Sequence, residues 1–561
     1  MIKRLGLLTL ILAITVSADA AMIVKVNGRV LDEKGNPVAG ARISDTWFAE
    51  EAGVLEPIKP ALSGKDGQFS LELETYNHRD LVVMAIDANG MVGGIAAVHP
   101  KSPEDLLQIT LAPLVETRVR FASENADRIL GKTYVSWCVG ADAIRIAGAR
   151  SRMPEFVIKL PPGRYTVRGN DSRHAEEVRE FTLEPGKPAD LGEIKLPLTP
   201  QAKLWGKPAP AWHVTDARGV SKAVQPSDFK GKWVVLEFWG YWCGPCIGRG
   251  LPGWMDFVEY HAADSDKFVV LAVHDPQATD FAMLDEKLVP IIRRTWRGQE
   301  LPFPILLDRS GKFVEDYGVR SWPTAILLDP EGRVVEVPAK DMLMGSWACE
   351  EFLASKLTPL PPEKRITRAL DRGLSLSVDE QSLAELMTFY GNVCGTAIHL
   401  DADALNAAGI GPETEVPLRV GGTLTLRAWL NLATEPFGLT YVADGDAIRV
   451  VRRTADNEGL SQSSTRQKAE NALVTEALQK KVTFEFKEAS LKQVIATLES
   501  LTGETFLVDP SCRRLGTINP DQAISESAED ESLSTALTRI LNPAGLAYVV
   551  RNEALIFTTA R

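Results

Sequence analysis

Apolar and polar residues alternate over short stretches in the N-terminal part of the chain, a pattern typical of β-strands. Residues 23–26 open one such stretch and residues 69–73 form another. Glycines and neighbouring polar residues interrupt the pattern, for example at 64–67, where tight turns are expected. Two successive all-β regions are therefore predicted, residues 21–112 and residues 113–200, and each is expected to form a β-sandwich.

The pattern changes after residue 203, where continuous apolar runs alternate with helical stretches. The apolar runs cover residues 233–239, 268–273, 303–307 and 325–328. Strands that alternate with helices predict an α/β fold. Residues 203–356 are therefore expected to form an α/β domain, and the proline-rich segment 358–362 is interpreted as a linker.

The last part of the chain contains an internal repeat. Residues 382–385 and 490–493 both have the form of a capping box, which opens a helix, and apolar residues follow each box at helical spacing. Both copies predict the order β-α-β-β-α-β-β, over residues 373–453 and 481–560, and each is long enough for a small core. The polar segment 453–479 between them is interpreted as a linker.

Length and charge narrow the class of protein. At roughly 150 residues per domain, a chain of 561 residues suggests about four domains. The net charge is −12, and the sequence contains no basic run. A nucleic-acid or anionic-membrane partner is therefore not expected, because both attract clustered lysine and arginine.

The first twenty residues have the form of an export signal. Lys3 and Arg4 precede an apolar stretch from Leu5 to Val16, and residues 18–20 offer small side chains to a signal peptidase. This stretch is shorter than the ~20 residues that span a bilayer, and an uncleaved anchor or a buried helix is the alternative. We expect residues 1–20 to be removed and the mature chain to be soluble in the periplasm or cell envelope, with no transmembrane span.

Two of the six cysteines lie close together, in the motif Cys243-Gly244-Pro245-Cys246. The motif follows the apolar run 233–239 and opens a helix, so the first sulfur should lie over free backbone N–H groups that stabilise a thiolate. The second cysteine is one turn further on and can close a disulfide. The pattern predicts that Cys243 attacks a substrate disulfide and that Cys246 resolves the mixed disulfide. The remaining cysteines are scattered singly, at Cys138, Cys349, Cys394 and Cys512.

Other uses of a cysteine pair fit the sequence less well. A zinc site would need a second pair with suitable spacing, which is missing, and a c-type haem site would need histidine at position 247, which is Ile247. A purely structural disulfide stays open as an alternative. The seven histidines, such as His213 and His274, are isolated and have no metal-ligand spacing. No metal and no cofactor are therefore expected.

Residues 238–246, Phe-Trp-Gly-Tyr-Trp-Cys-Gly-Pro-Cys, resemble the active-site segment of thioredoxin-like proteins. The longer frame resembles the TlpA/ResA-type extracytoplasmic oxidoreductases. It adds a lead-in at 206–210, the segment 229–232, Pro252 and a helical insertion around 280–297. The resemblance covers residues 203–356 and implies a thioredoxin-like fold with thiol–disulfide oxidoreductase activity.

The same resemblance implies a substrate surface beside the dithiol. In the family a cis-proline faces the two cysteines, and the residue before it offers backbone to an extended substrate. The segment 317–324 matches this loop, which assigns the role to Pro323 and places Trp322 and Thr324, together with Trp242, beside the substrate. An ordinary X-Pro turn is the alternative, since only about 5–6% of such bonds are cis.

Glu237 occupies the place where thioredoxins carry a buried carboxylate behind the dithiol. It lies in the middle of an apolar run, where a charge without a purpose is unfavourable. Burial should raise its pKa, which would suit it to take and return the proton of Cys246. The alternative is a solvated glutamate at a sheet edge.

The flanking regions resemble two further families. Gly28, Pro37, Gly40 and the turn at 66–69 match the carboxypeptidase regulatory-like (transthyretin-like) β-sandwich, which implies a spacer or docking role; the second β-region matches less closely. The two repeats resemble the short N-terminal domain of secretins and TonB-dependent receptors, which implies an interaction module for an envelope protein. Two packed α+β domains without a binding role are the alternative.

These features predict a multidomain chain with two N-terminal β-sandwiches, a central α/β thioredoxin-like fold and two C-terminal small α+β repeats. The expected function is exchange of an exported dithiol with cysteines of extracytoplasmic proteins. The Gly-Pro between the cysteines resembles that of reducing thioredoxins, and this resemblance implies the direction of reduction, which requires an upstream redox partner. A redox-sensing scaffold stays open. A thiol peroxidase is disfavoured because the P-x-x-x-T-x-x-C context is missing before Cys243.

Overall fold

The structure is a computed structural model, and it describes most of the chain. The described residues are 22–50, 54–75, 80–99, 106–140, 143–296, 298–338, 345–379, 381–416, 418–457, 460–462, 464–519 and 522–560. The expected export signal at residues 1–20 lies outside them. The chain divides into two compact units, residues 1–203 and 204–561, each of which is described by itself.

The first unit is built from strands, and its N-terminal part contains two sheets. One sheet has the order β6 (Gln68–Thr75), β1 (Met22–Leu31) and β9 (Leu107–Thr110). The other has the order β10 (Ala112–Pro113), β8 (Val92–Val98), β7 (Leu81–Ile86), β2 (Arg42–Ser44) and β5 (Ala61–Leu62). Alternate residues of β1 and β6 share one buried cluster with residues of β2 and β7, so the two sheets face each other.

The remaining strands of this unit form two further sheets. The smaller has the order β14 (Glu155–Leu160), β11 (Val115–Ser123) and β17 (Ala189–Leu196). The larger has the order β16 (Glu177–Leu183), β15 (Gly163–Asn170), β12 (Thr133–Val139), β13 (Ile144–Ser151), β3 (Trp47–Glu50) and β4 (Glu56–Pro57). These sheets enclose a second buried cluster.

Strand β3 departs from the sequence-based division of the chain. It lies within residues 21–112, yet it pairs in parallel with β13, and Trp47 is buried in the second cluster beside Trp137. Strands β3 and β4 of the first β-region therefore belong to a sheet of the second.

Both ring nitrogens of the buried His174 lie within hydrogen-bond distance of side chains in this unit. Its Nδ1 lies 2.7 Å from Asp171 Oδ1 and its Nε2 lies 2.8 Å from the Ser123 hydroxyl. Asp171 also accepts backbone N–H groups from Gly131 and Arg173, and the N–H of Glu124 is bonded to Leu196. Because Ser123 is the last residue of β11, this cluster ties the loop that contains Asp171 and His174 to the end of that strand.

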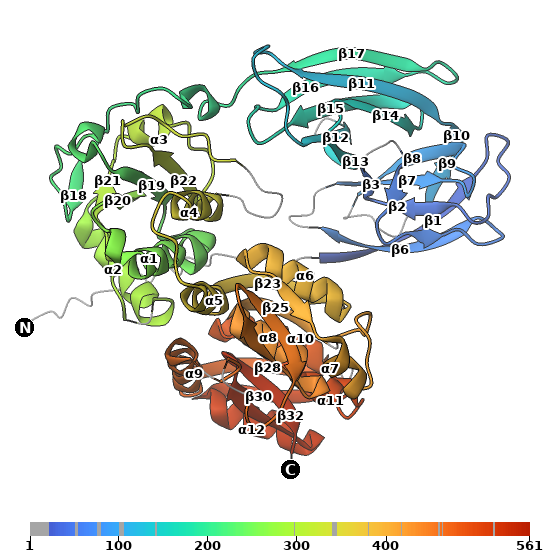
Figure 1. Ribbon diagram of the computed structural model, residues 1–561. Helices are drawn as coiled ribbons and strands as arrows, with labels where there is room; N and C mark the ends of the chain where they lie inside the picture. The colour runs from blue at the N-terminus through green and yellow to red at the C-terminus, as the bar shows by residue number, and fades with distance from the viewer. Residues whose placement is uncertain are drawn as a thin grey trace, which may run out of the picture. The chain divides into compact units, whose positions relative to one another are not determined.

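The second unit opens with a five-stranded sheet covered by helices (Figure 1). Its order is β18 (Asp216–Arg218), β21 (Ile305–Leu307), β20 (Phe268–His274), β19 (Trp233–Trp239) and β22 (Thr324–Leu328). Strands β19, β20 and β21 are parallel, while β18 and β22 run antiparallel to their neighbours. The helices are α1 (Leu251–Tyr260), α2 (Phe281–Arg294), α3 (Lys312–Asp316) and α4 (Ser346–Ala354).

Strand β19 has two buried faces, as its continuous apolar run predicts. Val234, Leu236 and Phe238 belong to one core, and Val235 and Trp239 belong to the other, which also contains both cysteines of the motif. Because successive side chains of a strand alternate between faces, Glu237 projects into the core that contains the cysteines.

The C-terminal part of this unit repeats one set of elements. The first copy has β23 (Gly373–Asp379), α6 (Leu383–Cys394), β24 (Ile398–Leu400), α7 (Ala402–Ala407), β25 (Arg419–Thr425), α8 (Leu426–Thr434), β26 (Leu439–Asp444) and β27 (Ala447–Arg452). The second has β28 (Lys481–Ser490), α10 (Leu491–Thr502), β29 (Phe506–Val508), α11 (Pro510–Arg514), β30 (Ala523–Ser532), α12 (Leu533–Leu541), β31 (Leu546–Arg551) and β32 (Ala554–Thr559). The capping boxes at Ser382 and Ser490 both form.

Helices α7, α9 and α11 were not part of the pattern predicted for the C-terminal repeats and the segment between them. Short helices α7 and α11 follow the second strand of each copy, and Asp401 and Asp509 cap them. The segment interpreted as a linker contains α9 (Thr465–Ala477), whose Val474 and Ala477 are buried. The copies also share a core, since Leu507, Ala554 and Ile556 of the second pack with the first.

Candidate active site

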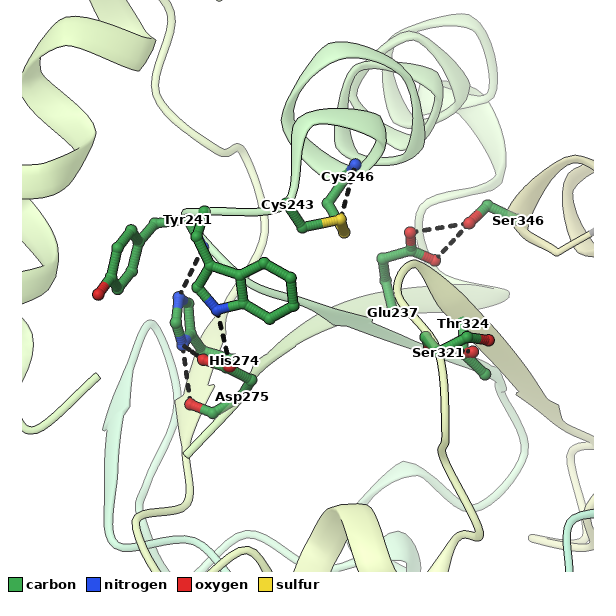
Figure 2. Close-up of a disulfide and its surroundings, with 10 residues drawn as sticks. Glu237, Tyr241, Cys243, Cys246, His274, Asp275, Ser321, Thr324 and Ser346 are labelled. Carbon is green, nitrogen blue, oxygen red and sulfur yellow. Dashed lines mark hydrogen bonds and ion pairs between the residues drawn. A yellow bond between two sulfur atoms is a disulfide. The ribbon is translucent and has the colours of Figure 1, made fainter. Parts of the chain in front are cut away.

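The two cysteines of the motif form a disulfide directly after β19 (Figure 2). The S–S distance is 2.07 Å and the Cα atoms lie 5.2 Å apart. Cys246 is completely buried, whereas 4% of Cys243 is exposed. Cys243 is therefore the sulfur that an incoming substrate can reach more readily.

The helix that follows begins at the cysteines. The backbone N–H of Cys246 donates to Cys243 Sγ over 3.2 Å, and the N–H of Ile247 donates to the Cys243 carbonyl. An N–H donor and a helix N-terminus both favour negative charge on sulfur. The local sequence thus provides the thiolate-stabilising environment that the motif predicts.

Residues 246–250 form a π-helical turn before α1. The N–H of Leu251 donates to the carbonyl of Cys246, five residues back, and the carbonyl of Ile247 accepts a 2.8 Å bond from Trp296 Nε1. Single π-turns within helices are frequent at functional sites. Here the turn lets a side chain beyond α2 hold the helix that carries Cys246.

Glu237 is fully buried beside this helix. Its carboxylate accepts hydrogen bonds from Trp254 Nε1 at 2.9 Å and from the Ser346 hydroxyl at 2.8 and 2.9 Å. Burial raises the pKa of Glu237 to about 8, although both donors act in the opposite direction. A carboxyl group with a pKa near neutrality can take and return a proton.

Gly250 is the point where Glu237, the helix and Pro323 meet. A Cβ atom on Gly250 would lie 2.7 Å from Glu237 Oε1 and 3.3 Å from Pro323 Cβ. Its backbone φ of −60° is ordinary, so contact rather than conformation is what excludes a side chain. The helix approaches the carboxylate this closely because the residue has no side chain.

We expect Gly250→Ala to reduce dithiol–disulfide exchange and to lower the free energy of unfolding by about 1–3 kcal/mol, because the added methyl group displaces Glu237 or the helix. Gly248→Ala is the matched control, since a Cβ there meets nothing within 4 Å. Exchange kinetics and urea denaturation measure both effects. Equal behaviour of the two variants would contradict the assigned contact.

Trp242 lies beside Cys243 on a polar support. Its Nε1 donates to Asp275 Oδ2 at 2.8 Å, and the N–H of Tyr241 donates to His274 Nε2 at 3.1 Å (Figure 2). His274 Nδ1 lies 2.9 Å from the Asp275 carbonyl, so it carries the proton of the ring. This support leaves 46% of Trp242 exposed, which is unusual for such a large apolar side chain.

The loop before β22 approaches the dithiol from the other side. The Trp322–Pro323 peptide bond is cis, as the resemblance implied. The rings of Trp322 and Trp242 lie edge to face, 5.8 Å apart, and Thr324 Oγ1 donates to the Ser321 carbonyl at 2.7 Å. Trp322 Nε1 is buried and has no hydrogen-bond partner among the described residues.

The structure therefore brings together the residues that the sequence singled out, and it adds others. Ser346, Trp254, Gly250, His274 and Asp275 were not identified from the sequence. The only sequence signal for Gly250 was that a residue without a side chain stands two positions before Pro252, in the expected active-site helix. Ser346 lies 109 residues from Glu237 and has no local signal.

The other four cysteines are not disulfide-bonded. Cys138, Cys349 and Cys394 are buried, and burial raises the pKa of each thiol. Among the residues that the structure describes, no group of three or more His, Cys, Asp and Glu side chains could hold a metal ion.

Comparison with known proteins agrees with this geometry. The Redoxin family matches residues 205–345. ResA, a thiol-disulfide oxidoreductase of Bacillus thuringiensis subsp. konkukian (strain 97-27), is 35% identical over 158 residues, which are 28% of this chain and 79% of the relative. ResA of Bacillus subtilis (strain 168) is 29% identical over 132 residues, 24% of this chain and 65% of the relative.

A solved structure, the pneumococcal exposed lipoprotein thioredoxin Etrx1 from Streptococcus pneumoniae strain TIGR4, is 32% identical. It covers 24% of this chain and 90% of its own, with a TM-score of 0.19. The central region is thus a thioredoxin-like oxidoreductase of the redoxin class. The chain belongs to the ResA family of thiol–disulfide oxidoreductases.

Proposed function

We propose that the chain reduces disulfides of exported proteins through Cys243 and Cys246. The observation that carries this proposal is the disulfide at the start of the active-site helix, with Glu237 buried next to that helix. The comparisons support the class of reaction. The direction of exchange, the compartment and the substrates are part of the proposal.

The reaction runs in two displacements. The Cys243 thiolate attacks one sulfur of a substrate disulfide, forms a mixed disulfide and releases a substrate thiolate. Cys246 then loses its proton to Glu237, attacks Cys243 and closes the Cys243–Cys246 bond, which frees the reduced substrate. Two electrons pass to the substrate, and an upstream dithiol partner returns them.

The substrate lies between Trp242 and the cis-proline loop. The exposed ring of Trp242 and the partly exposed Trp322 offer apolar contacts, and Pro323 and Thr324 border the same space. An extended segment that carries a cysteine fits such a surface, because backbone contacts tolerate different side chains. This surface supports a protein substrate.

The regions outside the thioredoxin-like domain bear on where the chain acts. The N-terminal leader and the family membership support an exported chain, and within the described residues no helix is long and apolar enough to cross a membrane. The β-regions, predicted to be carboxypeptidase regulatory-like sandwiches, would act as spacers. The C-terminal repeats, predicted to resemble the short N-terminal domain of secretins and TonB-dependent receptors, would dock an envelope protein.

The test is reduction of a protein disulfide by the purified full chain with a dithiol reductant, together with the reduction potential of the Cys243–Cys246 pair. Catalysed reduction and a potential below that of the substrate are expected. A potential well above that of the substrate disulfide would reverse the direction. Absence of exchange with any protein disulfide would leave a redox-sensing scaffold as the better interpretation.

A further inference from the structure

Helix α4 belongs to two cores at once. Its Cys349 and Leu353 pack in the core that contains the dithiol, while Trp347 packs in the core of the first repeat. Ser346, the first residue of the same helix, donates to Glu237. A displacement of α4 by the first repeat would therefore also move Ser346, the hydrogen-bond donor to Glu237.

A buried ion cluster fixes the position of α4. Glu350 is 1% exposed, and its Oε2 accepts bonds from Arg368 at 3.0 Å and from Arg372 at 2.9 Å. Arg368 lies on α5 (Pro362–Leu370), whose Ile366 and Leu370 are buried in the core of the first repeat. A buried carboxylate without partners is strongly unfavourable, so the two arginines stabilise Glu350 at this site.

The cluster also touches the active-site helix. A Cβ atom on Gly253 of α1 would lie 2.5 Å from Glu350 Oε1, so this carboxylate packs directly against the helix. The guanidinium of Arg372 lies 4.2 Å from the centre of the Trp347 ring, and that of Arg249, in the π-turn after Cys246, lies 5.6 Å from it. Arg372 thus contacts α4 through both Glu350 and Trp347.

We propose that Glu350, Arg368 and Arg372 are positioning residues through which the C-terminal repeats hold α4 against the dithiol and control proton transfer between Cys246 and Glu237. The proposal rests on the role of Glu237 proposed above. It assigns the repeats a function in the reaction itself, in addition to any docking.

The charges around Glu237 determine the direction in which the cluster shifts its pKa. The titratable groups that interact with Glu237 are Glu350 and Cys349 from α4. Cys246 of the active-site helix lies on the same side of β19 as Glu237 (Figure 2). The neighbours of Glu237 across the sheet, Ala272 and Ala325, carry no charge. The negative charge of Glu350 contributes to raising the pKa of Glu237, and the arginines oppose that charge.

Further charged groups surround Arg368. Arg368 interacts electrostatically with Asp256 of α1 and Glu351 of α4, in addition to Glu350. Its guanidinium lies 5.2 Å from the centre of the Phe257 ring. His261, at the end of α1, is buried, and burial and the nearby Arg368 lower its pKa to about 4. It is therefore neutral at neutral pH and does not compete for Glu350.

The experiment uses the full chain and measures the pH dependence of the exchange rate. Glu350→Gln removes a negative charge and should move the midpoint to lower pH by about half to one unit, whereas Arg372→Met should move it to higher pH by a similar amount. Arg372→Lys keeps the charge and should return the midpoint to that of the parent. A purely structural role would not shift the two variants in opposite directions.

Arg365→Met is the matched control, because Arg365 lies on the same helix α5 but forms an exposed ion pair with Asp446. It should leave the midpoint unchanged. Unchanged midpoints in Glu350→Gln and Arg372→Met, or shifts in one direction only, would overturn the proposal. If Arg372→Met does not fold, the isosteric Glu350→Gln alone decides, since an unchanged midpoint there removes the coupling.

A failure of this proposal can be told from a failure of the proposed function. If Glu237→Gln removes the titration but the cluster variants do not move it, only the coupling is wrong. If Glu237→Gln leaves the titration in place, Glu237 is not the proton acceptor, and both the coupling and the role of Glu237 fall. The proposed function itself fails only if the parent chain does not exchange with protein disulfides.

Discussion

Cys243→Ser is expected to lower the rate of protein-disulfide reduction by at least about a thousandfold, to the level of the uncatalysed reaction. A serine hydroxyl does not ionise near neutral pH and forms no stable bond to a substrate sulfur. The helix N-terminus and the Cys246 N–H, which stabilise charge on Cys243 Sγ, then have no thiolate to act on. The measurement is the rate of reduction of a protein disulfide at a fixed concentration of reductant.

Cys246→Ser should behave differently. The first displacement still occurs at Cys243, but the buried group that completes the second is gone, so a mixed disulfide with the substrate should accumulate. Non-reducing electrophoresis and mass spectrometry detect that adduct, which dithiothreitol should release. The opposite pattern, with the adduct on Cys246 in Cys243→Ser, would reverse the assignment of attacking and resolving cysteines.

Cys512→Ser provides the control for both variants. Cys512 lies in α11 of the second repeat, is half-buried and is not disulfide-bonded. Its loss should leave the exchange rate within about twofold of the parent, because it does not enter the two displacements. A large effect there would show that exchange passes through a third thiol.

The part of the site that the sequence predicted is the part that short-range rules determine. The alternation of faces along β19 places Glu237 among buried residues, and the spacing of Cys243 and Cys246 places them at the start of one helix. The capping boxes at Ser382 and Ser490 are likewise decided within one turn. In each case the residues that interact are close in sequence.

The part that the sequence did not predict depends on contacts between distant segments. Ser346 reaches Glu237 only because α4 packs across the sheet, and β3 leaves its own region to pair with β13. Helix α9 has little amphipathic character, and its place is set by packing against the second repeat rather than by its own pattern. The positions of α4, β3 and α9 therefore depend on the segments against which they pack.

Glu237→Gln is expected to reduce the exchange rate by about a hundredfold, the usual contribution of a general acid–base group. The amide can still accept from Trp254 and Ser346, so the fold around it is retained, but it cannot take the proton of Cys246. The pH dependence near 8 should disappear together with the rate, since Glu237 is the group whose pKa is raised to about 8. A rate within a factor of two of the parent would remove Glu237 from the mechanism.

The same substitution should change how stability depends on pH. Glu237 has a pKa of about 8 in the fold against 4.5 without it, so between these values the folded chain binds more protons than the unfolded chain. The contribution of Glu237 to the free energy of unfolding of the oxidised parent should therefore be highest below about pH 4.5. This contribution should fall as the pH rises through about 8. Glu237→Gln does not titrate, so the parent should lose stability relative to the variant by up to a few kcal/mol over this range, at about 1.4 kcal/mol per pKa unit. Urea denaturation of both oxidised proteins at a series of pH values measures the difference, and parallel curves would mean that Glu237 is ionised in the fold throughout.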